Sequence, residues 1–149
     1  MRVQFLIPGN PVGKGRPRFT KSGYAYTPPA TKDYEESVRW AYLNEVRKND
    51  GTLAFEAGVP IKASIDAFFQ IPKRLNKAQR KEALEGKLLP TQKPDADNIA
   101  KIVLDALNGF AYHDDSAVVE CVVRKKFGEV GHVTVLLEEV SKDGRCEMD

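Results

Sequence analysis

The stretch IKASIDAFFQI, residues 61–71, decides the fold class of this 149-residue chain. Its odd-numbered positions are all apolar, whereas most of its even-numbered positions are polar. Such alternation is typical of a β-strand that buries one face. A strand of this kind needs a sheet around it and a layer that covers its apolar face. The rest of the chain is therefore expected to supply further strands and helices.

The patterns on either side of this strand give an element order of β-α-β-α-α-β-β. Three more strands are expected, over residues 3–7, 118–127 and 133–140. Three helices are expected, over residues 31–49, 76–85 and 97–108. Thr31 and Asn76 are the expected N-caps of the first two helices, and the last two strands are expected to form a hairpin. We predict an α+β fold with a single mixed β-sheet and helices packed on one face.

Length and composition indicate one globular domain, residues 1–149. The chain is 42% hydrophobic and 30% charged, unlike a disordered protein. No apolar run reaches the roughly 20 residues of a membrane span, and the apolar start is too short for a signal peptide. We therefore expect a cytoplasmic protein with no membrane partner. Cys121 and Cys146 fit this compartment as unpaired thiols.

The net charge of +2 hides an uneven distribution of charged side chains. Residues 9–24 carry four basic side chains and no acid, and residues 72–93 carry seven basic side chains and two acids. Residues 95–120, in contrast, carry six acids and one lysine. Basic surface on either side of an acidic centre suits a polyanion that must reach bound cations, although any single run could be a solvated face.

Aspartates stand on both sides of the last predicted helix, in the stretch KPDADNIAKIVLDALNGFAYHDD, residues 93–115. Asp95 and Asp97 are two apart in an extended lead-in, so their carboxylates are expected to point the same way at about 7 Å spacing. Two carboxylates at that spacing can bind one hard cation such as Mg²⁺. Either acid could instead cap the helix, because aspartate is common at that position.

Asp114 and Asp115 follow the helix and can return to its start. The segment 109–115 spans at most about 23 Å when extended, and the helix is roughly 18 Å long. Asp115 is therefore expected to complete a metal site with Asp95 and Asp97, unless these acids serve only helix caps and turns. Three converging carboxylates repel one another unless a cation neutralises them.

Lys101 lies one turn into the predicted helix, on the same face as Asp97. Its ammonium could stabilise negative charge in the transition state of phosphodiester hydrolysis. Asp105 shares this face but lies two turns, roughly 12 Å, from Asp97. It is therefore not expected to bind the metal, although it could orient Lys101.

The run KPDADNIAKIVLDALNG, followed by HDDSAVV, resembles the signature of the RusA family of Holliday junction resolvases, endonucleases of bacteria and their prophages. The segments GNPVGKGRPRFT and YAYTPPATKDYEE are similar to the amino-terminal half of family members, so the likeness spans most of residues 3–127. Two features depart from the family pattern: Ala117 stands where many relatives have glutamine, and the most compact relatives lack the helix 76–85.

The resemblance implies a RusA-like homodimer that binds four-way DNA junctions and cuts two strands symmetrically, with Mg²⁺ or Mn²⁺ as cofactor. The catalytic and metal-binding acids of the family fall on Asp95, Asp97 and Asp115, and its functional lysine falls on Lys101. The predicted function is a metal-dependent endodeoxyribonuclease that resolves Holliday junctions in DNA recombination and repair.

Basic residues on both sides of the acidic centre are the expected DNA contacts. They are Lys14, Arg16, Arg18, Lys73 and Arg74. The first three alternate, so an extended backbone would present them together to phosphates, and the glycines at 13 and 15 would let the backbone approach DNA. Tyr24 and Tyr26 could stack on bases, but burial against the sheet is the expected arrangement.

Two other functions fit the same residues. One is a non-catalytic module that binds branched DNA or RNA, in which the acids only cap helices. The other is a metal-dependent phosphohydrolase of a small nucleotide, which needs an enclosed pocket where a junction nuclease needs an open basic face.

Overall fold

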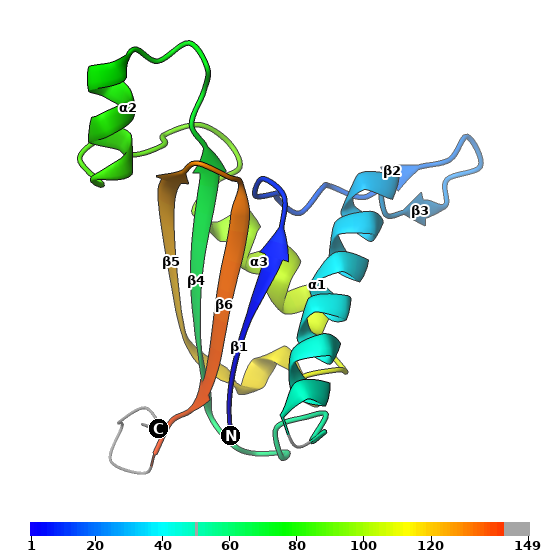
Figure 1. Ribbon diagram of the computed structural model, residues 1–149. Coiled ribbons are helices and arrows are strands. Elements are labelled where there is room, and N and C mark those ends of the chain that lie inside the picture. Colours follow the sequence, from blue (N-terminus) through cyan, green and yellow to red (C-terminus); the bar gives the residue numbers. More distant parts are fainter. Residues whose placement is uncertain (50, 142–149) are drawn as a thin grey trace.

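The computed structural model describes residues 1–49 and 51–141, and its centre is a four-stranded sheet. The strands of this sheet are β1 (Arg2–Pro8), β4 (Ile61–Gln70), β5 (Val118–Gly128) and β6 (His132–Glu139). Their order is β1-β6-β4-β5, with β4 antiparallel to β6 and parallel to β5. Figure 1 shows the four strands side by side. The predicted α+β fold with a mixed sheet is confirmed.

The alternation of apolar and polar residues over 61–71 places β4 inside this sheet. Ile61, Ala63, Ile65 and Ala67 are fully buried, whereas the residues between them are half-buried. The apolar residues face the helical layer, and the polar ones face the open side of the sheet. Removing this apolar row from water stabilises the fold by roughly 25 cal/mol for each Å² that is buried. This burial holds the helices against one face of the sheet.

The predicted hairpin of the last two strands is wrong. β5 and β6 follow one another across a short turn, yet β4 lies between them in the sheet. At its end β4 pairs through Gln70 with β5 and through Phe68 with β6. The connection therefore crosses the end of β4. Alternation identifies a strand but not its neighbours, because backbone hydrogen bonds are the same for any partner strand.

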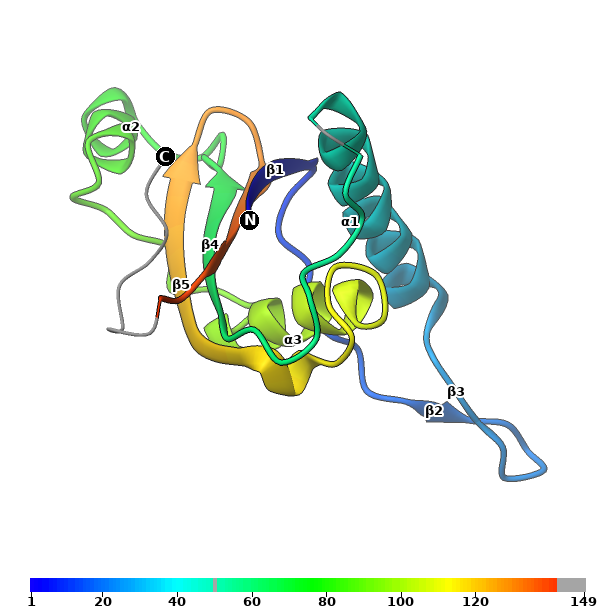
Figure 2. The same ribbon diagram turned by 90° about the horizontal axis from the view of Figure 1, so that it is seen from below.

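Two helices, α1 (Pro29–Lys48) and α3 (Ala96–Leu107), form the layer on the buried face of the sheet. Figure 2 shows both on the same side of the strands. The helix α2 (Lys77–Leu84) lies apart, beyond the end of the sheet (Figure 1). The buried stripe of α3 consists of Ile99, Ile102, Val103, Ala106 and Leu107, which recur three and four residues apart and so share one helix face.

The caps of the helices agree with the sequence at α2 but not at α1. Asn76 and Gln79 form a reciprocal capping box at the start of α2. The helix α1 begins at Pro29, and Thr31 does not cap it. Proline suits a first helical position because its missing N–H needs no partner there. Thr31 is buried, and its hydroxyl accepts a hydrogen bond from the Gly15 amide at 3.1 Å.

Residues 16–26 form a hairpin arm in a region where the sequence pattern predicts neither a strand nor a helix. Its strands β2 (Arg18–Phe19) and β3 (Ala25–Tyr26) pair with each other in a second, two-stranded sheet. The arm projects from the body beside the start of α1 (Figures 1 and 2). Tyr24 and Tyr26 are 73% and 44% exposed, so the prediction that they are buried against the sheet is wrong.

Two remaining predictions concern membranes and thiols. Among the described residues, no helix is both long and apolar enough to cross a membrane. Cys121 is a free, exposed thiol. The prediction for Cys146 falls outside the described residues.

Candidate active site

The start of α3 presents two aspartates to solvent. Asp95 is the N-cap residue, yet its side chain makes no capping hydrogen bond. Asp97 lies in the first turn, and both side chains are exposed. The positive end of the helix dipole favours negative charge at this place. The Asp95 carboxylate therefore does not cap the helix. Both acids are accessible to a ligand.

Lys101 lies one turn further along α3 and is exposed. In the described part of the chain, its ammonium has no ion pair. The hypothesis that Asp105 orients Lys101 is wrong. The Asp105 carboxylate lies 3.3 Å from the ammonium of Lys14 instead. Lys101 is thus available to an incoming anion.

Asp114 has a structural role in the turn after α3. It caps the short 3-10 helix η1 (Asp115–Ala117), where its carboxylate accepts a hydrogen bond from the Ser116 amide at 3.3 Å and another from the Ser116 hydroxyl. These bonds lower the pKa of Asp114 below its ordinary value, because they favour the charged form. A role in the turn, which was the alternative to metal binding, therefore explains Asp114 but not its neighbour Asp115.

Asp115 is half-buried and stands near the second half of α3. Its charge acts on the phenol of Tyr112, whose hydroxyl donates to the Leu104 carbonyl at 2.7 Å. Burial raises the pKa of Tyr112 far above its ordinary value, and the charges of Asp115 and Asp105 raise it further. Leu104 lies about two helical turns beyond Asp97. Asp115 therefore lies beside the second half of α3, whereas Asp95 and Asp97 lie at its start.

The three predicted metal ligands do not meet in the single chain. Over residues 1–49 and 51–141, no three histidine, cysteine, aspartate or glutamate side chains are grouped so that they could hold a metal ion. The donor chemistry of Asp95, Asp97 and Asp115 suits a hard cation, because all three are carboxylates that form no hydrogen bond or ion pair with another described side chain. Their chemistry fits such an ion, but the position of Asp115 does not.

The glycine-rich loop before the hairpin arm is fastened to the start of α3. The Lys14 amide donates to the Asn98 carbonyl at 3.1 Å. A Cβ atom on Gly13 would lie 2.8 Å from the Cβ of Pro94, and one on Gly15 would lie 2.6 Å from the Thr31 hydroxyl. The two glycines therefore allow close packing within the protein, and not the close approach to DNA that the sequence suggests.

Lys14 holds this loop between α1 and α3. Its ammonium lies 2.9 Å from a Glu35 carboxylate oxygen and 3.3 Å from one of Asp105. The predicted phosphate contact of Lys14 is therefore not favoured, because its charge is already paired. The sequence does not single out Glu35, since no local pattern marks an acid 21 residues away as a partner.

Replacing Lys14 by methionine is expected to lower the free energy of unfolding by about 1–2 kcal/mol. The change leaves Glu35 and Asp105 facing each other without a cation. Burial lowers the pKa of Lys14, but the hydrogen bonds and charges of its two partners outweigh burial and raise this pKa above 10.5. The stabilisation is thus fully present below pH 10.5 and is lost as the pH rises through the raised value.

Urea unfolding of both proteins at about pH 8 and about pH 11 tests this expectation. The difference between wild type and Lys14→Met should be large at the lower pH and small at the higher. Lys32→Met is the matched control, because Lys32 is exposed and has no partner among the described residues. Equal midpoints for the Lys14 and Lys32 variants would show that the ion pairs stabilise nothing.

The other predicted DNA contacts remain open to solvent. Arg16, Arg18, Lys73 and Arg74 are all exposed. None of them forms an ion pair within the described residues. The first two belong to the hairpin arm, whereas the last two lie in the segment between β4 and α2. These four cations can meet phosphates without breaking a bond inside the protein.

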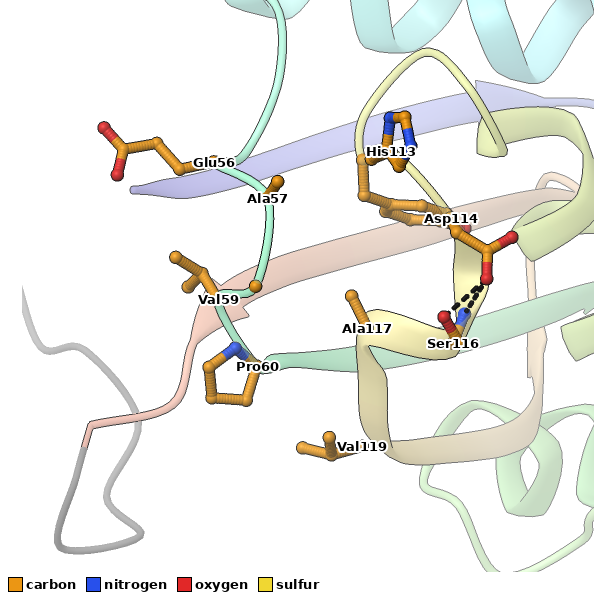
Figure 3. Close-up of a pocket in the computed structure, with 11 residues that line it drawn as sticks. Glu56, Ala57, Val59, Pro60, His113, Asp114, Ser116, Ala117 and Val119 are labelled. Atoms are coloured by element: carbon orange, nitrogen blue, oxygen red, sulfur yellow. Dashed lines mark hydrogen bonds between the residues drawn. The ribbon is translucent and has the colours of Figure 1, made fainter.

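A pocket of about 340 Å³ lies beside the turn that carries Asp114. Figure 3 shows residues 56–60 on one side and η1 with the start of β5 on the other. Ala57, Val59, Pro60, Ala117 and Val119 make much of its lining apolar. Its polar lining includes Glu56, His113 and Asp114, and among the described residues it includes neither lysine nor arginine. Such a lining does not suit the phosphates of a nucleotide.

Comparisons with known proteins identify the class to which this fold and these residues belong. The model of a family described as endodeoxyribonuclease RusA matches residues 8–138, and the chain belongs to this family. Membership implies endodeoxyribonuclease activity. The chain is also similar to a Bacillus subtilis (strain 168) protein named uncharacterized protein YqaN, with 34% identity over 143 residues that cover 93% of this chain and 97% of that protein.

Proposed function

We propose that the chain is a Mg²⁺-dependent endodeoxyribonuclease that binds four-way DNA junctions and resolves them by paired symmetric nicks. The observation that carries the proposal is the start of α3, where the side chains of Asp95, Asp97 and Lys101 are exposed and form no hydrogen bond or ion pair with the other described residues. Residues kept only for stability would normally be paired or capped. Within a family of endodeoxyribonucleases, free acids and a free lysine on one helix are best explained by catalysis.

In this proposal Asp95, Asp97 and Asp115 hold the divalent ion, Mg²⁺ or Mn²⁺, when DNA is bound. Such an ion would polarise a phosphoryl oxygen and lower the pKa of bound water. Because Asp115 stands apart from the other two in the single chain, the proposal requires the segment 109–115 to shift when DNA or a partner chain binds. Lys101 places its ammonium against the phosphate and stabilises the negative charge that grows on it.

The packing around α3 supports a role for DNA on this side of the molecule. The loop that precedes the hairpin arm is bonded to Asn98 in the first turn of α3. Arg16 and Arg18 therefore follow directly from a segment fixed to the helix that carries the acids. DNA phosphates held by these arginines would lie near Asp95 and Asp97. Two such sites in a homodimer would be related by a two-fold axis, which accounts for two symmetric cuts.

The structure gives less support to the two other functions. A small-nucleotide phosphohydrolase needs cations in an enclosed pocket, but no lysine or arginine of residues 1–49 and 51–141 lines the pocket beside Asp114. A module that only binds DNA would use its acids as caps, yet Asp95 makes no capping hydrogen bond. The nuclease proposal accounts for both observations.

The proposal is tested by incubating the purified chain with a labelled four-way junction, a Y-shaped fork and a linear duplex, with Mg²⁺ and with EDTA. We expect paired nicks at symmetric positions in the junction, little cutting of the duplex, and no cutting in EDTA. Binding without any cutting would favour the non-catalytic module. Cutting that persists in EDTA would contradict a metal-dependent mechanism.

A further inference from the structure

The hairpin arm lies outside the buried core. All eleven residues from 16 to 26 are exposed. The arm is held together by its own bonds, such as the Thr20 amide to the Tyr24 carbonyl at 2.8 Å and the Tyr24 amide to the Thr20 hydroxyl at 3.1 Å. A two-stranded hairpin of this size is marginally stable in water. Because none of its residues is buried, the arm contributes little to the core and is free to meet a partner.

Three aromatic rings lie on this arm and face water. Phe19 is 70% exposed, Tyr24 is 73% exposed and Tyr26 is 44% exposed. Single exposed apolar residues are common on protein surfaces, but three rings within eight residues on a projecting hairpin are not scattered. They form a surface onto which flat, apolar groups can stack.

The charges of the arm indicate which partner the rings meet. Arg16, Arg18 and Lys21 have no carboxylate partner among the described residues. No acidic residue occurs between Lys14 and Lys32 in the sequence. Cations interleaved with aromatic rings match a nucleic acid strand, because the cations meet phosphates while the rings stack on bases. An apolar protein partner would leave these cations buried without a counter-charge.

We propose that the hairpin arm binds unpaired bases at the branch point of the DNA, with Phe19 and Tyr24 stacked on bases and the arm's cations on the adjacent phosphates. The inference rests on the proposed function and deepens it, because it assigns recognition of the branch to the arm and cleavage to α3. Bases inside a continuous duplex are already stacked and offer no free face. The arm therefore favours branched DNA over linear DNA.

The test measures the affinity of the chain for three labelled DNAs in the presence of EDTA: a four-way junction, the same junction with unpaired thymines at the branch, and a linear duplex. For wild type, the unpaired bases should increase affinity by roughly fivefold or more, since unstacking no longer opposes binding. The double variant Phe19→Leu, Tyr24→Leu keeps apolar side chains but removes two stacking rings. It should lose this gain and bind the junction roughly 5- to 100-fold more weakly.

Two controls separate stacking from other effects. Trp40→Leu removes another exposed ring, 57% exposed on α1, and should leave all three affinities unchanged. Because the arm lies outside the core, the double variant should unfold at the same urea concentration as wild type. Its affinity for the linear duplex should change little, since the cations that meet phosphates remain.

Three results would overturn the inference. The double variant could keep the gain from unpaired bases, or it could lose affinity equally for junction and duplex. It could also change the oligomeric state in analytical ultracentrifugation, which would assign the arm to a second copy of the chain. Cleavage of the same junction with Mg²⁺ is measured separately. Failure of wild type to cut would reject the nuclease proposal and leave the binding result to decide the role of the arm.

Discussion

Replacing Asp97 by asparagine is expected to slow junction cleavage by roughly 1,000-fold, equivalent to about 4 kcal/mol of transition-state stabilisation. The amide keeps the shape of the side chain but lacks the charge that a divalent ion requires. The side chain is exposed and has no partner inside the described chain, so the substitution should alter stability by less than about 1 kcal/mol. Binding of the junction should be retained.

The measurement is a single-turnover cleavage rate at saturating protein, with junction affinity determined in parallel. Asp33→Asn is the matched control, because Asp33 is also an exposed aspartate on a helix but lies on α1. The control should cleave at the wild-type rate. If Asp97→Asn cut the junction as fast as the control does, the acids at the start of α3 would not be catalytic. A parallel loss of binding would instead show that Asp97 positions DNA.

Local patterns in the sequence were sufficient to predict most of the elements. Five apolar residues that recur at helical spacing in the last predicted helix are all buried in α3. Asn76 caps α2 as its position before a polar helix suggests. Each of these predictions depends on residues within one or two turns of each other. Helical and strand periodicity carry this information because they determine which side chains share a face.

Contacts between distant segments could not be predicted in the same way. The hairpin assigned to the last two strands is wrong because β4 inserts between them. Lys14 was expected to meet phosphate, but folding brings Glu35 from α1 and Asp105 from α3 to its ammonium. Nothing near Lys14 in the sequence marks these partners. The same limit applies to the tyrosines of the arm, whose exposure depends on where the arm leaves the body.

The predicted metal site depended on an argument from the maximum length of a chain segment. The length of the segment 109–115 sets only an upper bound on where Asp115 can lie. The segment does not run straight back, because Phe110 and Ala111 bond to the Leu107 carbonyl and the chain turns there. Asp115 therefore stops beside the second half of α3. A bound of this kind can exclude a contact, but it cannot establish one.

Replacing Ile102 by alanine is expected to lower the free energy of unfolding by about 2–5 kcal/mol. Ile102 is fully buried in the middle of α3, within the core beneath the sheet, so the lost methyl and methylene groups would leave a cavity. The measurement is a urea denaturation curve, with the midpoint lowered and the slope unchanged. Leu104→Ala is the control on the same helix, because Leu104 is only partly buried and should cost less than half as much.

This variant also separates the two roles of α3. Ile102 points into the core, whereas Asp97 and Lys101 are exposed on the same helix. At a temperature where Ile102→Ala remains folded, its cleavage rate should stay within about threefold of wild type, since no group that meets the phosphate has changed. Asp97→Asn should show the opposite combination, with normal stability and little cleavage. If folded Ile102→Ala did not cleave the junction, then the packing of α3 against the sheet would control the position of the acids. Core packing and catalysis could then not be varied independently.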